Sequence, residues 1–184
     1  MKLPPYIMVF DIESVGLHGE AFSYGFSVVS TAKSSRMGVA EVAFGKVSCA
    51  KGIAKGTLEN HKWVEANCKV DPPICPSLPQ MRQAFWDNWM YWKAQGAMLA
   101  ADVPWPVEAT FLSACVADDP EAREWQGPYP MLDIASIRMA AGLDPLGTEE
   151  RINEDELPAH DPLADSRQSA RLLLEALDKL GLLA

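Results

Sequence analysis

The sequence Tyr6-Ile7-Met8-Val9-Phe10 is followed directly by Asp11-Ile12-Glu13. Five consecutive apolar residues predict a central strand that is buried on both faces. Side chains two residues apart in a strand point to the same side, so Asp11 and Glu13 would project next to each other from the strand end. Two adjacent carboxylates repel each other and are costly to bury, and a bound cation such as Mg²⁺, which prefers oxygen ligands, would offset that cost. An Asp-x-Glu pair is frequent by chance, so the pair alone favours an ordinary strand end.

Two further strands are predicted after this one. Residues 21–30 are rich in aromatic and β-branched side chains at every second position, and residues 37–46 look similar. Three antiparallel strands in succession fit this opening. Residues 47–79 contain four of the chain's prolines near their end, and we expect an irregular insertion or loop there.

The rest of the chain alternates helices with one more strand. A short apolar strand is expected at 97–103, and Asp161 and Pro162 are suited to begin a last helix as its N-cap and first residue. Other helices are predicted at 80–94, 106–116 and 131–141, and a polar connector at 142–159. Strands first, then helices around a strand, predict an α/β layered domain with a mixed sheet flanked by helices. The length of 184 residues suits one domain, 1–184, with a full core.

Composition narrows the class of protein. The apolar share of 48% is that of a folded domain, but no apolar run approaches the ~18 residues that cross a bilayer. The first residues do not resemble a signal peptide, so we expect a cytoplasmic protein without membrane contact. The formal net charge of −9 argues against a general nucleic-acid coat protein, although a nuclease with bound cations stays open. The four cysteines lack the C-x₂-C spacing of a zinc site, which favours free thiols.

Three more residues are candidates for chemistry. Asp102 closes the second apolar strand, and sites in α/β sheets gather at the carboxyl ends of strands. His160 precedes the last helix and Asp165 falls in its first turn, where the helix N-terminus favours a negative charge. Taken one at a time, Asp102 could simply cap the following helix, His160 could be a solvated loop residue, and Asp165 an ordinary first-turn acid.

In combination these residues resemble the DEDDh 3′→5′ exonucleases. The order Asp-x-Glu, Asp, His-x₄-Asp is similar to the three motifs of that family, which has a ribonuclease-H-like fold and includes polymerase proofreading subunits, ribonuclease T and oligoribonuclease. Residues 11–17 look like the first motif, Asp102 with Phe111-Leu112 like the second, and 160–170 like the third. The resemblance spans nearly the whole chain, from Tyr6 to Leu177.

The resemblance implies a two-metal reaction at the 3′ end of single-stranded DNA or RNA that releases nucleoside monophosphates. His160 would take a proton from the attacking water. Four carboxylates would bind two divalent cations, Mg²⁺ or Mn²⁺: Asp11, Glu13, Asp102 and Asp165. Backbone groups of the first motif would hold the terminal nucleoside: Ser14, Val15, Gly16 and Leu17, with Leu17 against the base.

Two alternatives remain open at this point. The chain could be a hydrolase of free nucleotides or small phosphodiesters, which the low overall charge allows, or a catalytically silent nucleic-acid-binding module on the same fold. The last helix is also a candidate surface for a homodimer.

Other features have simpler interpretations. Trp86, Trp89 and Trp92 have helical spacing and are expected to pack in the core. Trp63 and Trp105 are expected in loops, where they are better candidates for stacking on bases. Glu108 could be a fifth acid, but we expect it to face solvent. The basic stretch is interpreted as a solvated face rather than a phosphate contact: Lys46, Lys51, Lys55, His61 and Lys62.

Overall fold

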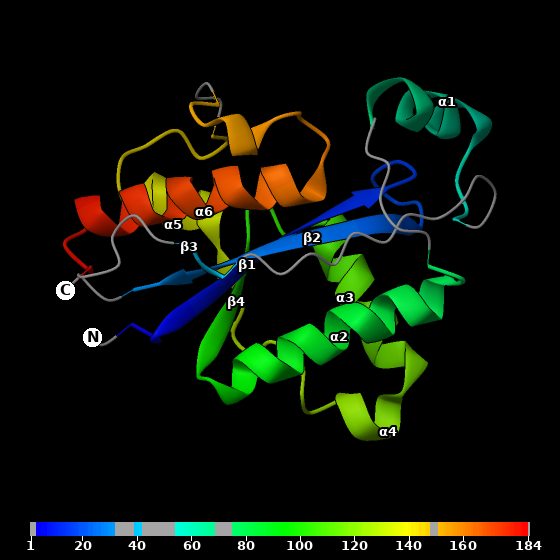
Figure 1. Cartoon of the computed structure of the whole chain (residues 1–184), viewed down its shortest axis with the longest axis horizontal. Helices are drawn as coiled ribbons and strands as arrows, with labels where there is room; N and C mark the ends of the chain where they lie inside the picture. The colour runs from blue at the N-terminus through cyan, green and yellow to red at the C-terminus, as the bar shows by residue number, and fades with distance from the viewer. Residues whose placement is uncertain (1–2, 32–38, 42–53, 69–74, 148–150, 184) are drawn as a thin grey trace.

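A mixed five-stranded sheet forms the centre of the computed structural model, which describes residues 3–31, 39–41, 54–68, 75–147 and 151–183 (Figure 1). The strand order is β3-β2-β1-β4-β5. Strands β1, β2 and β3 are antiparallel neighbours, whereas β4 and β5 run parallel to β1. The strands are β1 Tyr6–Ser14, β2 Ala21–Ser30, β3 Val39–Glu41, β4 Ala97–Ala101 and β5 Leu132–Asp133. This confirms the mixed α/β architecture and is consistent with a ribonuclease-H-like layout.

Helices cover both faces of the sheet, with α2 and α3 on one side and α5 and α6 on the other (Figure 1). The α-helices are α1 Leu58–Asn67, α2 Leu78–Ala94, α3 Val107–Asp118, α4 Pro120–Arg123, α5 Ile134–Ala140 and α6 Pro162–Lys179, and the 3₁₀ helix η2 is Glu154–Glu156. Asp161 caps α6 as expected, because its Oδ1 accepts a hydrogen bond of 3.0 Å from the backbone N–H of Leu163.

Alternation along β1 separates two apolar cores. Met8 and Phe10 pack with α2 and α3, whereas Ile7 and Val9 pack with α5 and α6. Asp11 and Glu13 continue the second series, since side chains of a strand alternate between faces. Both acids therefore point to the side of the sheet that α6 covers.

Gly25 lets the start of α6 lie directly on the sheet. It is opposite Asp11 in the β1–β2 register. A Cβ atom at Gly25 would lie 2.3 Å from the backbone nitrogen of Leu163 and 2.4 Å from the carbonyl carbon of Pro162. The buried hydroxyls of Ser27 and Ser166 join the two elements one pleat further on, 2.9 Å apart. This close approach brings the first turn of α6 next to Asp11.

Several expectations about elements need correction. Region 47–79 contains α1, whose first turn is capped by the Thr57 side chain, so Trp63 lies in a helix and not in a loop. The prolines that suggested irregularity lie after this helix. Strand β5, which was not predicted, precedes α5. It was missed because two residues are too few for a periodicity.

Other expectations are confirmed. Trp86, Trp89 and Trp92 are buried in the core of the α2 side. The described cysteines, Cys68, Cys75 and Cys115, are free thiols, and Cys49, Lys46 and Lys51 lie outside the described residues. None of the helices in the described ranges is long and apolar enough to cross a membrane.

Candidate active site

Carboxylates from β1 and α6 meet at one end of the sheet. Glu13 projects from β1, and Asp165 lies in the first turn of α6. Ligand atoms of Glu13, His160 and Asp165 all lie within 4.8 Å of one another. Asp11 precedes Glu13 on the same face, and the charge of Asp165 is the first among the neighbouring charges that raise the pKa of Asp11. The first motif, residues 11–17, and the third motif, residues 160–170, lie near opposite ends of the sequence, and the fold places them together.

Glu108 is a further acid of this site, contrary to the expectation that it faces solvent. Strand β4 pairs with β1 only as far as Val9, so β1 runs on past the end of β4. The Glu108 carboxyl, which is 8% exposed, accepts hydrogen bonds from the backbone N–H groups of Ile12 and of Glu108 itself. It therefore occupies the edge of β1 that β4 leaves open.

Burial and mutual repulsion raise the proton affinity of the acids. The pKa of Asp11 lies well above its usual value, because the carboxyl is buried and because Asp165, Glu13, Glu108 and Asp102 add negative charge nearby. Burial and the charge of Asp165 raise the pKa of Glu13 to about 7. Burial raises the pKa of Glu108 to about 7 as well. An arrangement that opposes its own ionisation in this way is stabilised when positive charge enters it.

His160 lies at the rim of the carboxylate cluster. Its Nδ1 is 3.7 Å from Oε1 of Glu13, and its side chain is 43% exposed. The backbone N–H of His160 donates to the carboxylate of Asp165. The residue has a φ of 61°, and this left-handed conformation is uncommon outside glycine and is found at functional sites. The ring of Trp63 packs edge-on against His160 with centroids 4.8 Å apart, so α1 forms one wall beside the histidine.

Asp102 follows β4 and is half-buried. Its backbone carbonyl accepts a hydrogen bond of 3.0 Å from the N–H of Ala135. Its charge raises the pKa values of Asp11 and Glu108, and its effect on Asp11 is smaller than that of Glu108. Asp102 thus lies at the border of the carboxylate cluster, and the charge of Glu108 raises the pKa of Asp11 more than the charge of Asp102 does.

The turn after β1 contains the residues expected to hold a nucleoside. Ser14 donates from its hydroxyl to the carbonyl of Gly16 at 2.9 Å, and Gly16 has a φ of 82°, a conformation that glycine adopts without strain. Leu17 is 67% exposed at the tip, whereas Val15 is buried. Of these four residues, Leu17 therefore has the side chain that is open to a ligand.

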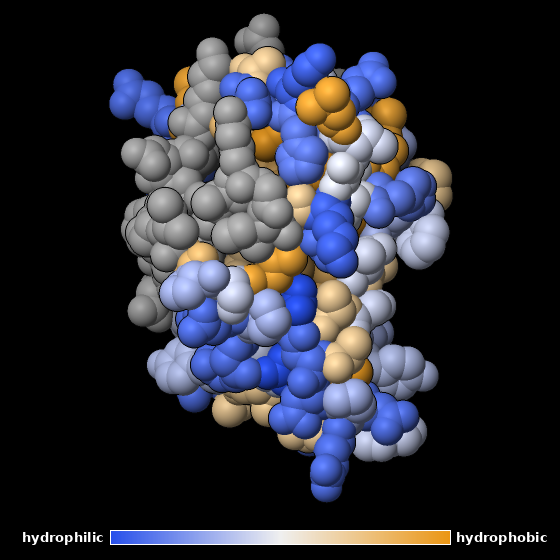
Figure 2. All heavy atoms as spheres, turned by 90° about the vertical axis from the view of Figure 1, so that its right-hand side faces the viewer, coloured by the Kyte–Doolittle hydropathy of each residue, from blue (hydrophilic) through white to orange (hydrophobic). Residues whose placement is uncertain are grey.

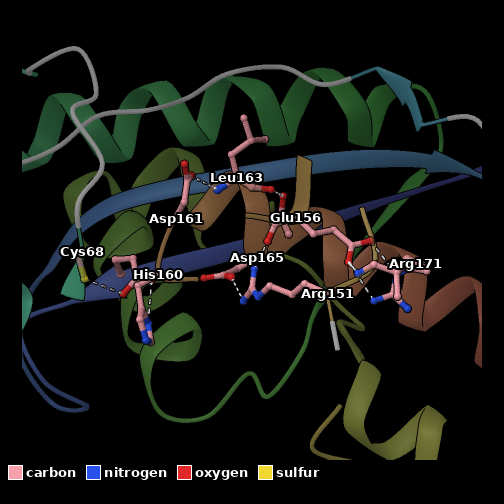
Figure 3. Close-up of polar contacts among 11 residues, drawn as sticks. Cys68, Arg151, Glu156, His160, Asp161, Leu163, Asp165 and Arg171 are labelled. Atoms are coloured by element: carbon pink, nitrogen blue, oxygen red, sulfur yellow. Dashed lines mark hydrogen bonds and ion pairs between the residues drawn. The ribbon is translucent and has the colours of Figure 1, made fainter. Parts of the chain in front are cut away.

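A second layer of polar residues surrounds the acids (Figure 3). The guanidinium of Arg151 contacts the carboxylate of Asp165. The thiol of Cys68 donates to Oε2 of Glu13 at 3.7 Å, and burial together with the charge of Glu13 raises the pKa of that thiol to about 12. The end of the molecule that carries the β1–β2 turn and α1 faces the viewer in Figure 2, where the coloured surface is mostly hydrophilic with scattered hydrophobic side chains.

The donor set fits hard divalent cations. Carboxylate oxygens predominate, and three of the four expected metal-binding acids, Asp11, Glu13 and Asp165, come together with Glu108 beside them. Mg²⁺ and Mn²⁺ bind such oxygen ligands, and a cation among these acids would remove the repulsion that raises their pKa values.

The sequence pointed to Glu108 as a solvent-facing acid and did not single out Arg151, for different reasons. Glu108 precedes Phe111 and Leu112 by three and four residues, and this spacing places all three on one face of a helix. Since Phe111 and Leu112 are buried, their spacing was a usable signal for Glu108. Arg151 lies in a polar connector, and its contact with Asp165 depends on the tertiary fold alone.

A scan against protein-family models and a search of curated proteins both find no match to this chain. The likeness to the DEDDh exonucleases therefore rests on the residues of the motifs and on the sheet that positions them.

Proposed function

We propose that this chain is a divalent-metal-dependent 3′→5′ exonuclease that releases nucleoside monophosphates from single-stranded DNA or RNA. The observation that carries the proposal is the convergence of Asp11, Glu13 and Asp165 next to His160 at the end of a mixed sheet. Two divalent cations held there would polarise the terminal phosphodiester and activate a water molecule.

The residues of the chain have separate tasks in this proposal. Asp11, Glu13 and Asp165 hold the cations, together with Asp102 or Glu108 from the segment after β4. The raised pKa values of Glu13 and Glu108, both about 7, mean that cation binding displaces protons and tightens as pH rises through neutrality. His160, exposed at the rim, accepts the proton of the attacking water.

The test is a cleavage assay with single strands labelled at the 5′ end, as DNA and as RNA of equal sequence, in Mg²⁺, Mn²⁺ or EDTA. A ladder that shortens from the 3′ end with metal and is absent in EDTA supports the proposal, and the faster polymer identifies the substrate class. Asp11→Asn should abolish the ladder while the circular dichroism spectrum is retained. Asp178→Asn, an exposed acid at the other end of α6, is the matched control and should cleave like the wild type.

A hydrolase of nucleotides or small phosphodiesters is the second candidate, favoured by the net charge of −9. Long polyanions are repelled by such a charge more than small ones are. Turnover that falls as the strand lengthens beyond a dinucleotide would favour this second candidate over the exonuclease.

A further inference from the structure

One cationic side chain reaches into the acid cluster. Arg151 donates from Nη2 to Oδ1 of Asp165 and from Nη1 to the backbone carbonyl of Glu156 (Figure 3). The side chains of Arg151 and Asp165 are 19% and 15% exposed, so this ion pair borders solvent. A ligand that enters the site from solvent can therefore reach the guanidinium.

Glu156 fixes the segment that carries Arg151. Its carboxylate is 1% exposed and accepts hydrogen bonds from Arg171 at 2.7 and 3.0 Å, from Asn153 Nδ2 at 2.6 Å and from the backbone N–H of Ile152 at 3.2 Å. Arg171 belongs to α6, the helix that also carries Asp165. The segment 151–156 is thus tied to α6, and Arg151 is held at a defined place beside the site.

Bound cations would compete with Arg151 for Asp165 and leave its guanidinium available to a phosphate of the substrate. In the absence of a cation, the guanidinium of Arg151 balances the charge of the Asp165 carboxylate through their ion pair. When the charge of Asp165 is shared with bound cations, its attraction for the guanidinium weakens. A nucleic-acid phosphate that approaches the acids needs positive charge next to it, and a guanidinium matches phosphate oxygens with paired N–H donors.

We propose that Arg151 is a substrate-positioning residue, which pairs with Asp165 in the absence of substrate and contacts a phosphate at the 3′ end of the bound strand. This inference rests on the proposed function, because it takes the carboxylate cluster as the place where the strand end binds. The hydrogen bonds to the Glu156 carboxylate fix this residue, and its backbone carbonyl accepts a hydrogen bond from the Arg151 guanidinium.

The test measures binding of a 5′-fluorescein-labelled single-stranded oligonucleotide by anisotropy, over a series of salt concentrations, with Ca²⁺ in place of Mg²⁺ to suppress cleavage. Arg151→Ala should weaken binding about 10- to 100-fold, the usual loss for a charge-assisted hydrogen bond. The slope of log K against log salt should fall by about 0.7, which corresponds to one phosphate contact on a single strand. A structural role would not change that slope.

Two controls sharpen the measurement. Arg82→Ala removes a guanidinium that pairs with Asp118 through two hydrogen bonds, on helices α2 and α3, and should bind like the wild type. Arg151→Lys keeps the charge without the paired donors, so it should keep the salt slope with weaker binding. If Arg151→Ala does not fold, Arg151→Gln takes its place with the same expected change in slope.

Metal binding, followed by calorimetric titration with Mn²⁺, gives an independent readout. Arg151→Ala should bind Mn²⁺ at least as tightly as the wild type, because a competitor for Asp165 is gone. Weaker Mn²⁺ binding would overturn the inference, as would an unchanged salt slope or an equal loss of oligonucleotide binding in Arg82→Ala.

If the wild type shortens strands while Arg151→Ala binds them normally, the inference fails and the exonuclease proposal stands. If the wild type neither binds nor shortens strands, both the inference about Arg151 and the exonuclease proposal fail.

Discussion

Replacement of Glu108 by glutamine should stabilise the metal-free protein at high pH. Burial raises the pKa of Glu108 from 4.5 to about 7, so the ionised carboxylate opposes folding. Below pH 4.5 the group is protonated in both states and the folded protein has its full stability. That stability is lost progressively as pH rises from 4.5 through about 7, because over this range the unfolded chain has released a proton that the folded state still holds. At about 1.4 kcal/mol per pKa unit, the loss at pH 8 is about 3 kcal/mol.

Glutamine has nearly the same shape, and its side-chain oxygen can accept the same backbone hydrogen bonds as Glu108. Glu108→Gln should therefore recover up to about 3 kcal/mol at pH 8 and almost nothing at pH 4. With a slope of about 2 kcal/mol per M, the urea midpoint should rise by about 1.5 M at pH 8.

The assay is urea unfolding in EDTA at pH 4 and pH 8, followed by tryptophan fluorescence. Glu124→Gln, at an exposed position, is the control for the same substitution and should change neither midpoint. An equal effect of Glu108→Gln at the two pH values, or a loss of stability at pH 8, would refute the assignment of Glu108 to the buried acid cluster.

Three further results are expected. His160→Ala should lower the cleavage rate about 10²- to 10⁴-fold, the range for a lost general base, and an unchanged pH–rate profile would contradict that role. Gly25→Ala should cost about 1–3 kcal/mol by pushing α6 from the sheet, whereas Gly127→Ala, with no atom within 4 Å of the added Cβ, should be neutral in urea unfolding. Mn²⁺ at 100 times its dissociation constant should stabilise the protein by about 2.7 kcal/mol. Calorimetry should show tighter Mn²⁺ binding at pH 8 than at pH 6, because Glu13 and Glu108 must lose protons when the metal binds. Equal Mn²⁺ affinity at the two pH values would contradict metal binding by these acids.

Much of the fold could be predicted from local patterns. The apolar run before Asp11 and the alternation in β2 identified the two central strands, and the Asp161-Pro162 pair identified the start of α6. The helix α1 could not be predicted in this way. It has no buried residue, so it has no apolar stripe to produce a helical period.

The candidate site was predictable where strand geometry or helix capping determines a side chain. Asp11 and Glu13 were expected to project next to each other because a strand fixes their directions, whereas their convergence with Asp165 was implied by the resemblance to the DEDDh exonucleases. Glu108 was assigned to solvent because charged residues near a helix start are usually exposed, whereas here the open edge of β1 offers a backbone donor from Ile12. The contact between Arg151 and Asp165 spans a connector without regular pattern, and only the folded chain shows it.

Exonuclease activity at the 3′ end is best tested by release of label from a single strand labelled at its last internucleotide phosphate, with Mg²⁺ at pH 8. We expect the label to appear in a nucleoside monophosphate from the first turnover, and EDTA or Asp11→Asn to leave it in the strand. Label that stays in the strand with the folded wild-type protein and Mg²⁺, or that first appears in longer fragments, would contradict a 3′→5′ exonuclease.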